Sequence, residues 1–228
     1  PPEPATLPAG DRLSPALPTL AERMSAAGYE TAAFHSNPWL TDELTGLTRG
    51  FEHTSIGTRN TMGIFRTSEQ GGPETVGSIR SWLDSRDSSR PFFMFVNILE
   101  AHLPYDPPES YMTQELPELS LDDSVTADWA HEYNAGLHRD EDVNWDRIWS
   151  LYAGDVHTAD GYLGQVLEEL RERGLFDDAV IIVTSDHGEN LGDYRLMDHQ
   201  FGVFRTLIEV PLVIRAPGRL EPGTRDDP

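Results

Sequence analysis

The sequence contains no cysteine and no lysine, and all 17 of its basic residues are arginine. The lack of cysteine excludes disulfides, thiolate zinc sites and a cysteine nucleophile within these 228 residues. Long apolar runs are also lacking, and none approaches the roughly 20 residues that a transmembrane helix needs. We therefore expect no membrane-spanning segment.

Positive charge is scarce, because 39 acidic residues face 17 basic ones and leave a formal net charge of −22. This balance argues against binding to nucleic acid, which needs a basic face, and against binding to an anionic membrane surface. A carboxylate-rich chain without lysine indicates adaptation to high salt, where screening removes self-repulsion; the alternative is ordinary solubility charge. The length suits one large α/β domain or two small ones.

The most informative stretch is AVIIVTSDHGEN, residues 179–190. Its apolar run predicts a strand buried on both faces, as in a parallel sheet. Asp186 and His187 follow this strand, at the edge where open α/β sheets bind ligands, and Gly188 permits a sharp turn. A carboxylate next to an imidazole suits a divalent cation. The same pair could instead cap the next turn, and spacing alone leaves both interpretations open.

A second apolar strand is predicted at residues 91–99, and it leads to His102 at the same kind of edge. A single histidine in such a place is more often structural than catalytic. His102 is therefore a candidate whose role depends on what else reaches that edge.

The rest of the chain alternates between helical and extended patterns. Thr19 and Glu22 form a capping-box pattern that predicts a helix ending at Gly28. Further helices are predicted at 73–86 and 143–173, and strands at 29–34 and 210–215. We expect a tether at 1–18, irregular structure at 40–72, a surface excursion at 106–142 and a loop at 190–198.

Three segments resemble the sulfatase family of the alkaline phosphatase superfamily: FMFVNILEAHLPY at 93–105, IIVTSDHGE at 181–189 and HQFGVFRTLIEVPLVIRAPG at 199–218. Residues 20–34 and 151–170 fit the same family, in the family's order. The resemblance implies an α/β, alkaline-phosphatase-like sandwich with a mostly parallel mixed sheet flanked by helices. It also implies that residues 1–228 form a single, partial catalytic domain.

The resemblance implies roles for particular residues. Asp186 and His187 would be metal ligands, with Ca²⁺ the most usual ion and Mg²⁺, Mn²⁺ or Zn²⁺ alternatives. His102 and His199 would be catalytic and substrate-binding, as anion binders or proton donors to the leaving group. These roles are chemically sensible, because an anionic ester needs positive charge at its oxygens and its leaving alkoxide needs a proton or a cation.

Two departures from the family pattern stand out. The family's nucleophile lies in a Cys- or Ser-x-Pro-x-Arg motif near a pair of metal-binding Asp residues, and no such motif occurs here. We expect the chain to begin after it, and the polypeptide alone to bind metal weakly and to be inactive. Residues 35–38 also replace a Gly-Lys-x-His segment that is typical of arylsulfatases, and Asn37 there is a candidate substrate hydrogen-bond donor.

The sequence therefore predicts a metal-dependent hydrolase of sulfate monoesters, acting on a small-molecule or carbohydrate ester. The loss of the lysine anchor leaves a phosphoester or phosphonate ester hydrolase, or a phosphotransferase, as an alternative on the same fold. An alternative of another class is a binding module that kept the fold and lost the chemistry.

Overall fold

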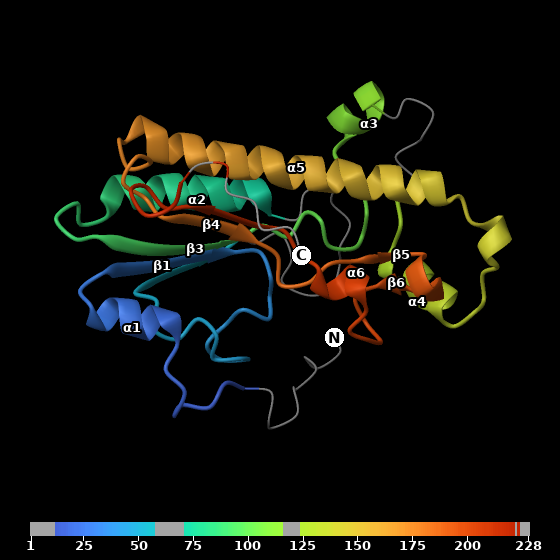
Figure 1. Cartoon of the computed structure of the whole chain (residues 1–228), viewed down its shortest axis with the longest axis horizontal. Helices are drawn as coiled ribbons and strands as arrows, with labels where there is room; N and C mark the ends of the chain where they lie inside the picture. Colours follow the sequence, from blue (N-terminus) through green and yellow to red (C-terminus); the bar gives the residue numbers. More distant parts are fainter. Residues whose placement is uncertain (1–11, 58–70, 116–123, 222, 224–228) are drawn as a thin grey trace, which may run out of the picture. The chain divides into compact units, whose positions relative to one another are not determined.

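We analysed a computed structural model of the chain, which describes residues 12–57, 71–115, 124–221 and 223. The chain divides into two compact units, residues 1–101 and 102–228 (Figure 1). They are called unit 1 and unit 2, and each is described by itself. Most of the tether expected at residues 1–18 lies outside the described residues.

Unit 1 is built on a parallel sheet, as the apolar strand patterns predict. Its described elements are α1 (Leu20–Ala26), β1 (Glu30–His35), β2 (His53–Ile56), α2 (Gly72–Ser85) and β3 (Phe92–Asn97). The strands pair in the order β2-β1-β3, and β1 runs in register with β3 from Glu30 opposite Phe92 to His35 opposite Asn97. Both α1 and α2 contact β1 and lie on opposite sides of the sheet in Figure 1. The central strand is therefore buried on both faces.

The predicted start of α1 is confirmed in atomic detail. The amide of Glu22 donates to Thr19 Oγ1 at 3.1 Å, and the amide of Thr19 donates to the Glu22 carboxylate at 2.8 Å. Arg49 then binds the second oxygen of the same carboxylate at 2.8 Å. This reciprocal cap satisfies helix-terminal N–H groups that would otherwise lack partners.

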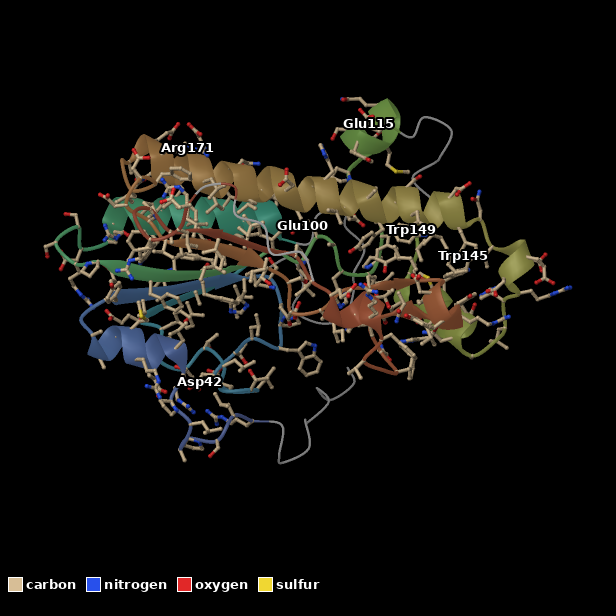
Figure 2. The ribbon with its side chains drawn as sticks, viewed as in Figure 1. Asp42, Glu100, Glu115, Trp145, Trp149 and Arg171 are labelled. Atoms are coloured by element: carbon tan, nitrogen blue, oxygen red, sulfur yellow. The ribbon has the colours of Figure 1, made fainter. Side chains whose placement is uncertain are left out.

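Unit 2 is arranged along one long helix. Its elements within the described residues are α3 (Glu109–Glu115), α4 (Ala127–Asn134), the 3₁₀ turn η1 (Asp140–Asp142), α5 (Trp145–Glu172), β4 (Ile181–Thr184), β5 (Asn190–Leu191), the 3₁₀ turn η2 (Asp193–Arg195), β6 (Met197–Asp198), α6 (Arg205–Ile208) and β7 (Leu212–Arg215). Trp145 and Arg171 mark the two ends of α5 (Figure 2). None of the helices in the described ranges has the length and apolarity needed to cross a bilayer.

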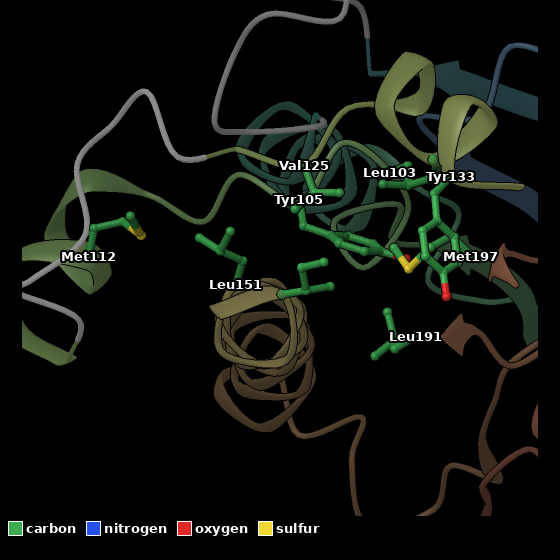
Figure 3. Close-up of a cluster of buried hydrophobic side chains, with 10 residues drawn as sticks. Leu103, Tyr105, Met112, Val125, Tyr133, Leu151, Leu191 and Met197 are labelled. Atoms are coloured by element: carbon green, nitrogen blue, oxygen red, sulfur yellow. The ribbon is translucent and has the colours of Figure 1, made fainter. Parts of the chain in front are cut away.

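The core of unit 2 corrects one prediction. Residues 106–142 were expected to form a surface excursion, but α3, α4 and the segment before α4 contribute buried side chains to the main cluster. That cluster includes Leu103, Tyr105, Met112, Val125, Ala130, Tyr133, Ile148, Leu151, Leu191 and Met197, most of which are labelled in Figure 3. The prediction was wrong because each segment contributes only one or two buried residues within a polar stretch, which is too few for a clear periodic signal.

Three further expectations need correction. The irregular structure expected at 40–72 is interrupted by β2, a short strand that is held by pairing with β1 rather than by its own pattern. The loop expected at 190–198 contains the β5–β6 hairpin. Finally, β4 is not buried on both faces: it pairs antiparallel with β7, and Ile182 is 60% exposed. Antiparallel strands commonly leave one face uncovered, so an apolar run did not guarantee burial.

Candidate active site in unit 2

Three histidines from distant parts of the sequence meet in unit 2. The ring of His199 stacks on that of His187, with centroids 4.1 Å apart and planes inclined by 21°. The ring of His102 meets His199 edge-on, with centroids 5.3 Å apart. His102 follows the end of unit 1, His187 follows β4, and His199 follows β6. Tertiary structure therefore brings together three residues that the sequence proposed separately.

Backbone carbonyls fix the orientation of two of these rings. Nδ1–H of His102 donates to the carbonyl of Leu103 at 2.7 Å, and Nδ1–H of His187 donates to the carbonyl of Gly188 at 2.7 Å. A carbonyl oxygen can only accept, so in each neutral ring the proton is on Nδ1 and Nε2 carries the lone pair. In metal sites, a ligating histidine commonly donates its other ring N–H to a carbonyl or carboxylate, which fixes the ring in the same way.

The loop after β4 presents Asp186 beside His187. The Asp186 side chain is 81% exposed, and its Oδ1 lies 3.9 Å from Nε2 of His187. Two donors that each lie about 2.0–2.2 Å from one ion are at most about 4.4 Å apart, so this spacing allows one cation to be shared. Gly188 anchors the loop, because its N–H donates to the Leu207 carbonyl at 2.8 Å and a side chain at this position would overlap the Thr206 carbonyl.

His199 has a different partner, the carboxylate of Asp198. Nδ1 of His199 lies 2.5 Å from Oδ1 of Asp198, and the backbone N–H of His199 donates to the same oxygen at 2.6 Å. This carboxylate raises the pKa of His199. Burial opposes ionisation of Asp198, yet its bonds with His199 hold the pKa of that carboxyl below its usual value. The pair therefore favours an imidazolium beside a carboxylate.

A second carboxyl, Glu189, lies beside this pair. Burial, followed by the charge of Asp198, raises the pKa of Glu189 to about 7. Burial also raises the pKa of the Tyr105 phenol, whose hydroxyl faces Glu189. Glu189, Asp198 and His199 each offer one ligand atom within 4.8 Å of the other two, the one such group among the described residues. Carboxylates and imidazoles suit divalent cations, and the Asp186–His187 pair, on which the resemblance places the metal, offers the same two donor types.

The candidates differ in where the structure places them. Asp186, His187, His102 and His199 all lie in unit 2, within the arrangement described above. Asn37 lies in unit 1, where its Oδ1 accepts from the N–H of Trp39 at 2.9 Å and its carbonyl accepts from Nδ1 of His35 at 3.0 Å. Asn37 therefore forms the turn that an Asn before Pro favours.

Sequence reasoning assigned no role to Asp198, Glu189 or Tyr105. A signal was present, since Glu189 belongs to the Asp-His-Gly-Glu stretch and Asp198 immediately precedes His199. Neither position could be singled out without knowing that residues 190 and 198 pair across a hairpin.

Comparison with known proteins identifies the family and the fold. The chain matches the Sulfatase family over residues 3–228. It is 28% identical over 155 residues to an arylsulfatase of Clostridium perfringens, a match that covers 63% of this chain and 31% of the relative. Among solved structures, the phosphonate monoester hydrolase of Agrobacterium radiobacter superposes with a TM-score of 0.60 at 22% identity, covering 92% of this chain and 54% of that one.

A further solved structure is BT4656 in complex with its substrate D-glucosamine-2-N,6-O-disulfate, with a TM-score of 0.59 at 17% identity, covering 91% of this chain and 57% of that one. These likenesses define an α/β, alkaline-phosphatase-like fold with a parallel sheet flanked by helices. The chain belongs to the sulfatase family. It spans about a third of the length of the curated relative and about half of the solved structures.

Proposed function

We propose that this chain carries part of the active site of a metal-dependent sulfate monoester hydrolase. The observation that supports this most directly is the convergence of His102, His187 and His199. Nδ1 of the first two rings donates to a backbone carbonyl, and Nδ1 of His199 lies 2.5 Å from the Asp198 carboxylate. Three imidazoles oriented in this way beside an exposed carboxylate form a site for an anion and a cation. A packed core gives no reason for such an arrangement.

In this proposal Asp186 and His187 hold the divalent cation. The 3.9 Å spacing of their donor atoms and the carbonyl bond at Nδ1 of His187 support this assignment. The ion would supply positive charge to the ester's oxygens as negative charge develops there. Ca²⁺ is our first expectation, and Mg²⁺, Mn²⁺ and Zn²⁺ suit the same mixed donors.

The remaining residues act on the ester itself. His199, paired with Asp198, offers a positive ring to a sulfate oxygen or a proton to the leaving oxygen, and His102 offers a second ring next to it. Asn37 of unit 1 stays a separate prediction from the sequence, as a substrate hydrogen-bond donor. The nucleophile would come from a Cys- or Ser-x-Pro-x-Arg motif, which these 228 residues do not contain.

The proposed substrate is a small-molecule or carbohydrate sulfate ester. The complex of BT4656 with a sulfated glucosamine supports a carbohydrate, and the arylsulfatase relative supports an aryl ester. The likeness to a phosphonate monoester hydrolase supports a second candidate, hydrolysis of phosphonate or phosphate esters at the same site. The two candidates share every residue named here and differ in the charge and shape of the ester.

Asp186→Ala tests the proposed function in the natural, full-length protein. We expect it to abolish hydrolysis of p-nitrophenyl sulfate and to remove one bound divalent cation per chain. Asp177→Ala is the matched control, because that carboxylate is 94% exposed and lies outside the site. Full activity in Asp186→Ala would contradict the proposal. Parallel assays with a phosphonate monoester distinguish the second candidate.

A further inference from the structure

The hairpin strand that precedes His199 is held by a buried hydrogen-bond network that extends well beyond the histidine. Thr206 Oγ1 donates to Asn190 Oδ1 at 2.6 Å, and Asn190 Nδ2 donates to the carbonyl of Asp198 at 3.0 Å. Asn190 is fully buried and Asp198 is 4% exposed. Buried polar groups of this kind are costly unless they are satisfied, so the network defines a single position for the backbone of Asp198.

Met197, the other residue of β6, is fixed by hydrogen bonds from α4. Asn134, the last residue of α4, donates from Nδ2 to the carbonyl of Met197 at 2.9 Å and accepts from its N–H at 2.8 Å. The side chain of Met197 is fully buried in the core of unit 2. The two residues of β6 are thus held by one asparagine each, Asn134 and Asn190.

The Asp198 side chain is fixed at both oxygens. Oδ1 receives the backbone N–H of His199 and lies 2.5 Å from its Nδ1, while Oδ2 accepts from Nε2 of Gln200 at 3.1 Å. The backbone at Asp198 is left-handed, with φ of +72°. Residues with side chains pay for this conformation, and it persists where the surroundings over-determine it. Here it places the carboxylate against the ring of the following residue.

We propose that Asp198 is a positioning residue for His199: its carboxylate, 2.5 Å from Nδ1, determines that Nε2 is the nitrogen that His199 presents to a bound ester. This inference rests on the proposed function, because it assigns a task to a ring that is itself assigned there. Without the carboxylate, the His199 ring could rotate or exchange its tautomer, and the wrong nitrogen would face the ester. In the neighbouring His187 and His102, Nδ1 donates to a backbone carbonyl instead, and a side-chain substitution cannot remove that carbonyl.

The kinetic test compares two esters in the full-length protein that carries Asp198→Asn. Asparagine keeps the size of the side chain and tolerates the left-handed backbone, but it removes the negative charge next to Nδ1, so a neutral amide oxygen no longer holds the ring by charge. An alkyl sulfate has a poor leaving group, an alkoxide, which depends on a correctly placed proton donor. The p-nitrophenolate of p-nitrophenyl sulfate leaves without one. We expect kcat to fall roughly 10²-fold for the alkyl ester and only a few-fold for the p-nitrophenyl ester, with KM nearly unchanged.

Asp193→Asn is the matched control, because Asp193 lies in the turn of the same hairpin and accepts from the Leu191 N–H rather than from His199. It should leave the ratio of the two kcat values unchanged. An equal loss for both esters in Asp198→Asn would assign Asp198 a purely structural role and overturn the proposal, as would no loss at all.

A second measurement also uses the full-length protein and needs no turnover. With ¹⁵N-labelled histidine, the Nδ1–H of His199, identified by its loss in His199→Gln, should be shifted downfield and protected from exchange by Asp198. Asp198→Asn should remove this signal. If wild type lacks it, the positioning role is wrong. If the signal behaves as expected but neither ester is hydrolysed, the positioning of His199 stands and the proposed function fails.

Discussion

At the scale of single residues, burial shifts the pKa values of several polar side chains in this protein. Glu189, Asp198 and His199 influence one another's pKa because burial removes the water that would screen their charges. His35 in unit 1 also has a pKa shifted by burial, but it has no charged partner in the part of the chain that the structure describes. Its ring is fully buried, Nδ1 donates to the Asn37 carbonyl, and Nε2 has no partner among the described residues.

His35 should make the stability of the protein depend on pH. Burial lowers its pKa below the usual 6.5, so below pH 6.5 the unfolded chain takes up a proton that the folded chain resists. The unfolded state then binds more protons, and the free energy of unfolding falls as pH falls, by up to about 1.4 kcal/mol per pH unit. Above pH 6.5 this contribution is constant.

Urea unfolding at pH 5 and pH 8 measures the effect. The difference in unfolding free energy between the two pH values should be smaller in His35→Gln than in wild type. His53→Gln, at an exposed position in β2, provides the control and should keep the wild-type difference. An unchanged pH dependence in His35→Gln would show that the imidazole is not protected from protonation.

At the scale of elements, close backbone contacts decide where the site residues can lie. The loop after β4 reaches α6 at Gly188, whose N–H donates to Leu207 and whose missing side chain leaves room for the Thr206 carbonyl. Thr206 in turn begins the network that holds β6. The loop with Asp186 and His187 and the strand with His199 are therefore anchored on the same short helix.

Gly188→Ala should disrupt this anchor. The added methyl would overlap a backbone carbonyl that no rotamer change can move, so we expect a loss of more than about 1 kcal/mol in unfolding free energy and weaker divalent-cation binding. Gly164→Ala in α5 is the control, because its added methyl meets nothing and alanine favours the helix by about 0.5–1 kcal/mol. Thermal unfolding and Mn²⁺ titration of both variants compare their stability and their cation binding. If Gly188→Ala were as stable as Gly164→Ala, the predicted anchoring role of Gly188 would be wrong.

At the scale of the whole molecule, net charge is the dominant property. A formal charge of −22 over 228 residues generates repulsion that unfolding relieves. Ions screen it, since the Debye length falls from about 10 Å at 0.1 M to about 3 Å at 1 M salt. We expect the melting temperature to rise by several degrees between 0.1 M and 2 M KCl.

The charge dependence can be separated from other effects of salt. Replacing two exposed acids near the end of α5, Glu172→Gln and Asp178→Asn, removes two negative charges without touching the core. The melting temperature of the double variant should rise less with KCl than that of the wild type. A melting temperature that is independent of salt in both proteins would rule out self-repulsion as a limit on stability.

Much of this molecule follows from the sequence alone. The capping box at Thr19, the long helix α5 and the strands β1, β3 and β4 were predicted because each depends on interactions within a few residues or on a repeating apolar pattern. Asp186, His187, His102 and His199 are predicted site residues because they follow or neighbour apolar strands in motifs that resemble the sulfatase family.

Only the tertiary structure decided how those residues meet. The stacking of His187 on His199, the carboxylate at Nδ1 of His199 and the burial of Glu189 depend on pairings across the β5–β6 hairpin and between α6 and the loop after β4. The core roles of α3 and α4 depend in the same way on single apolar residues meeting distant partners. Such contacts leave no periodic trace in the sequence, because their energy comes from desolvation and packing between segments that only the folded chain brings together.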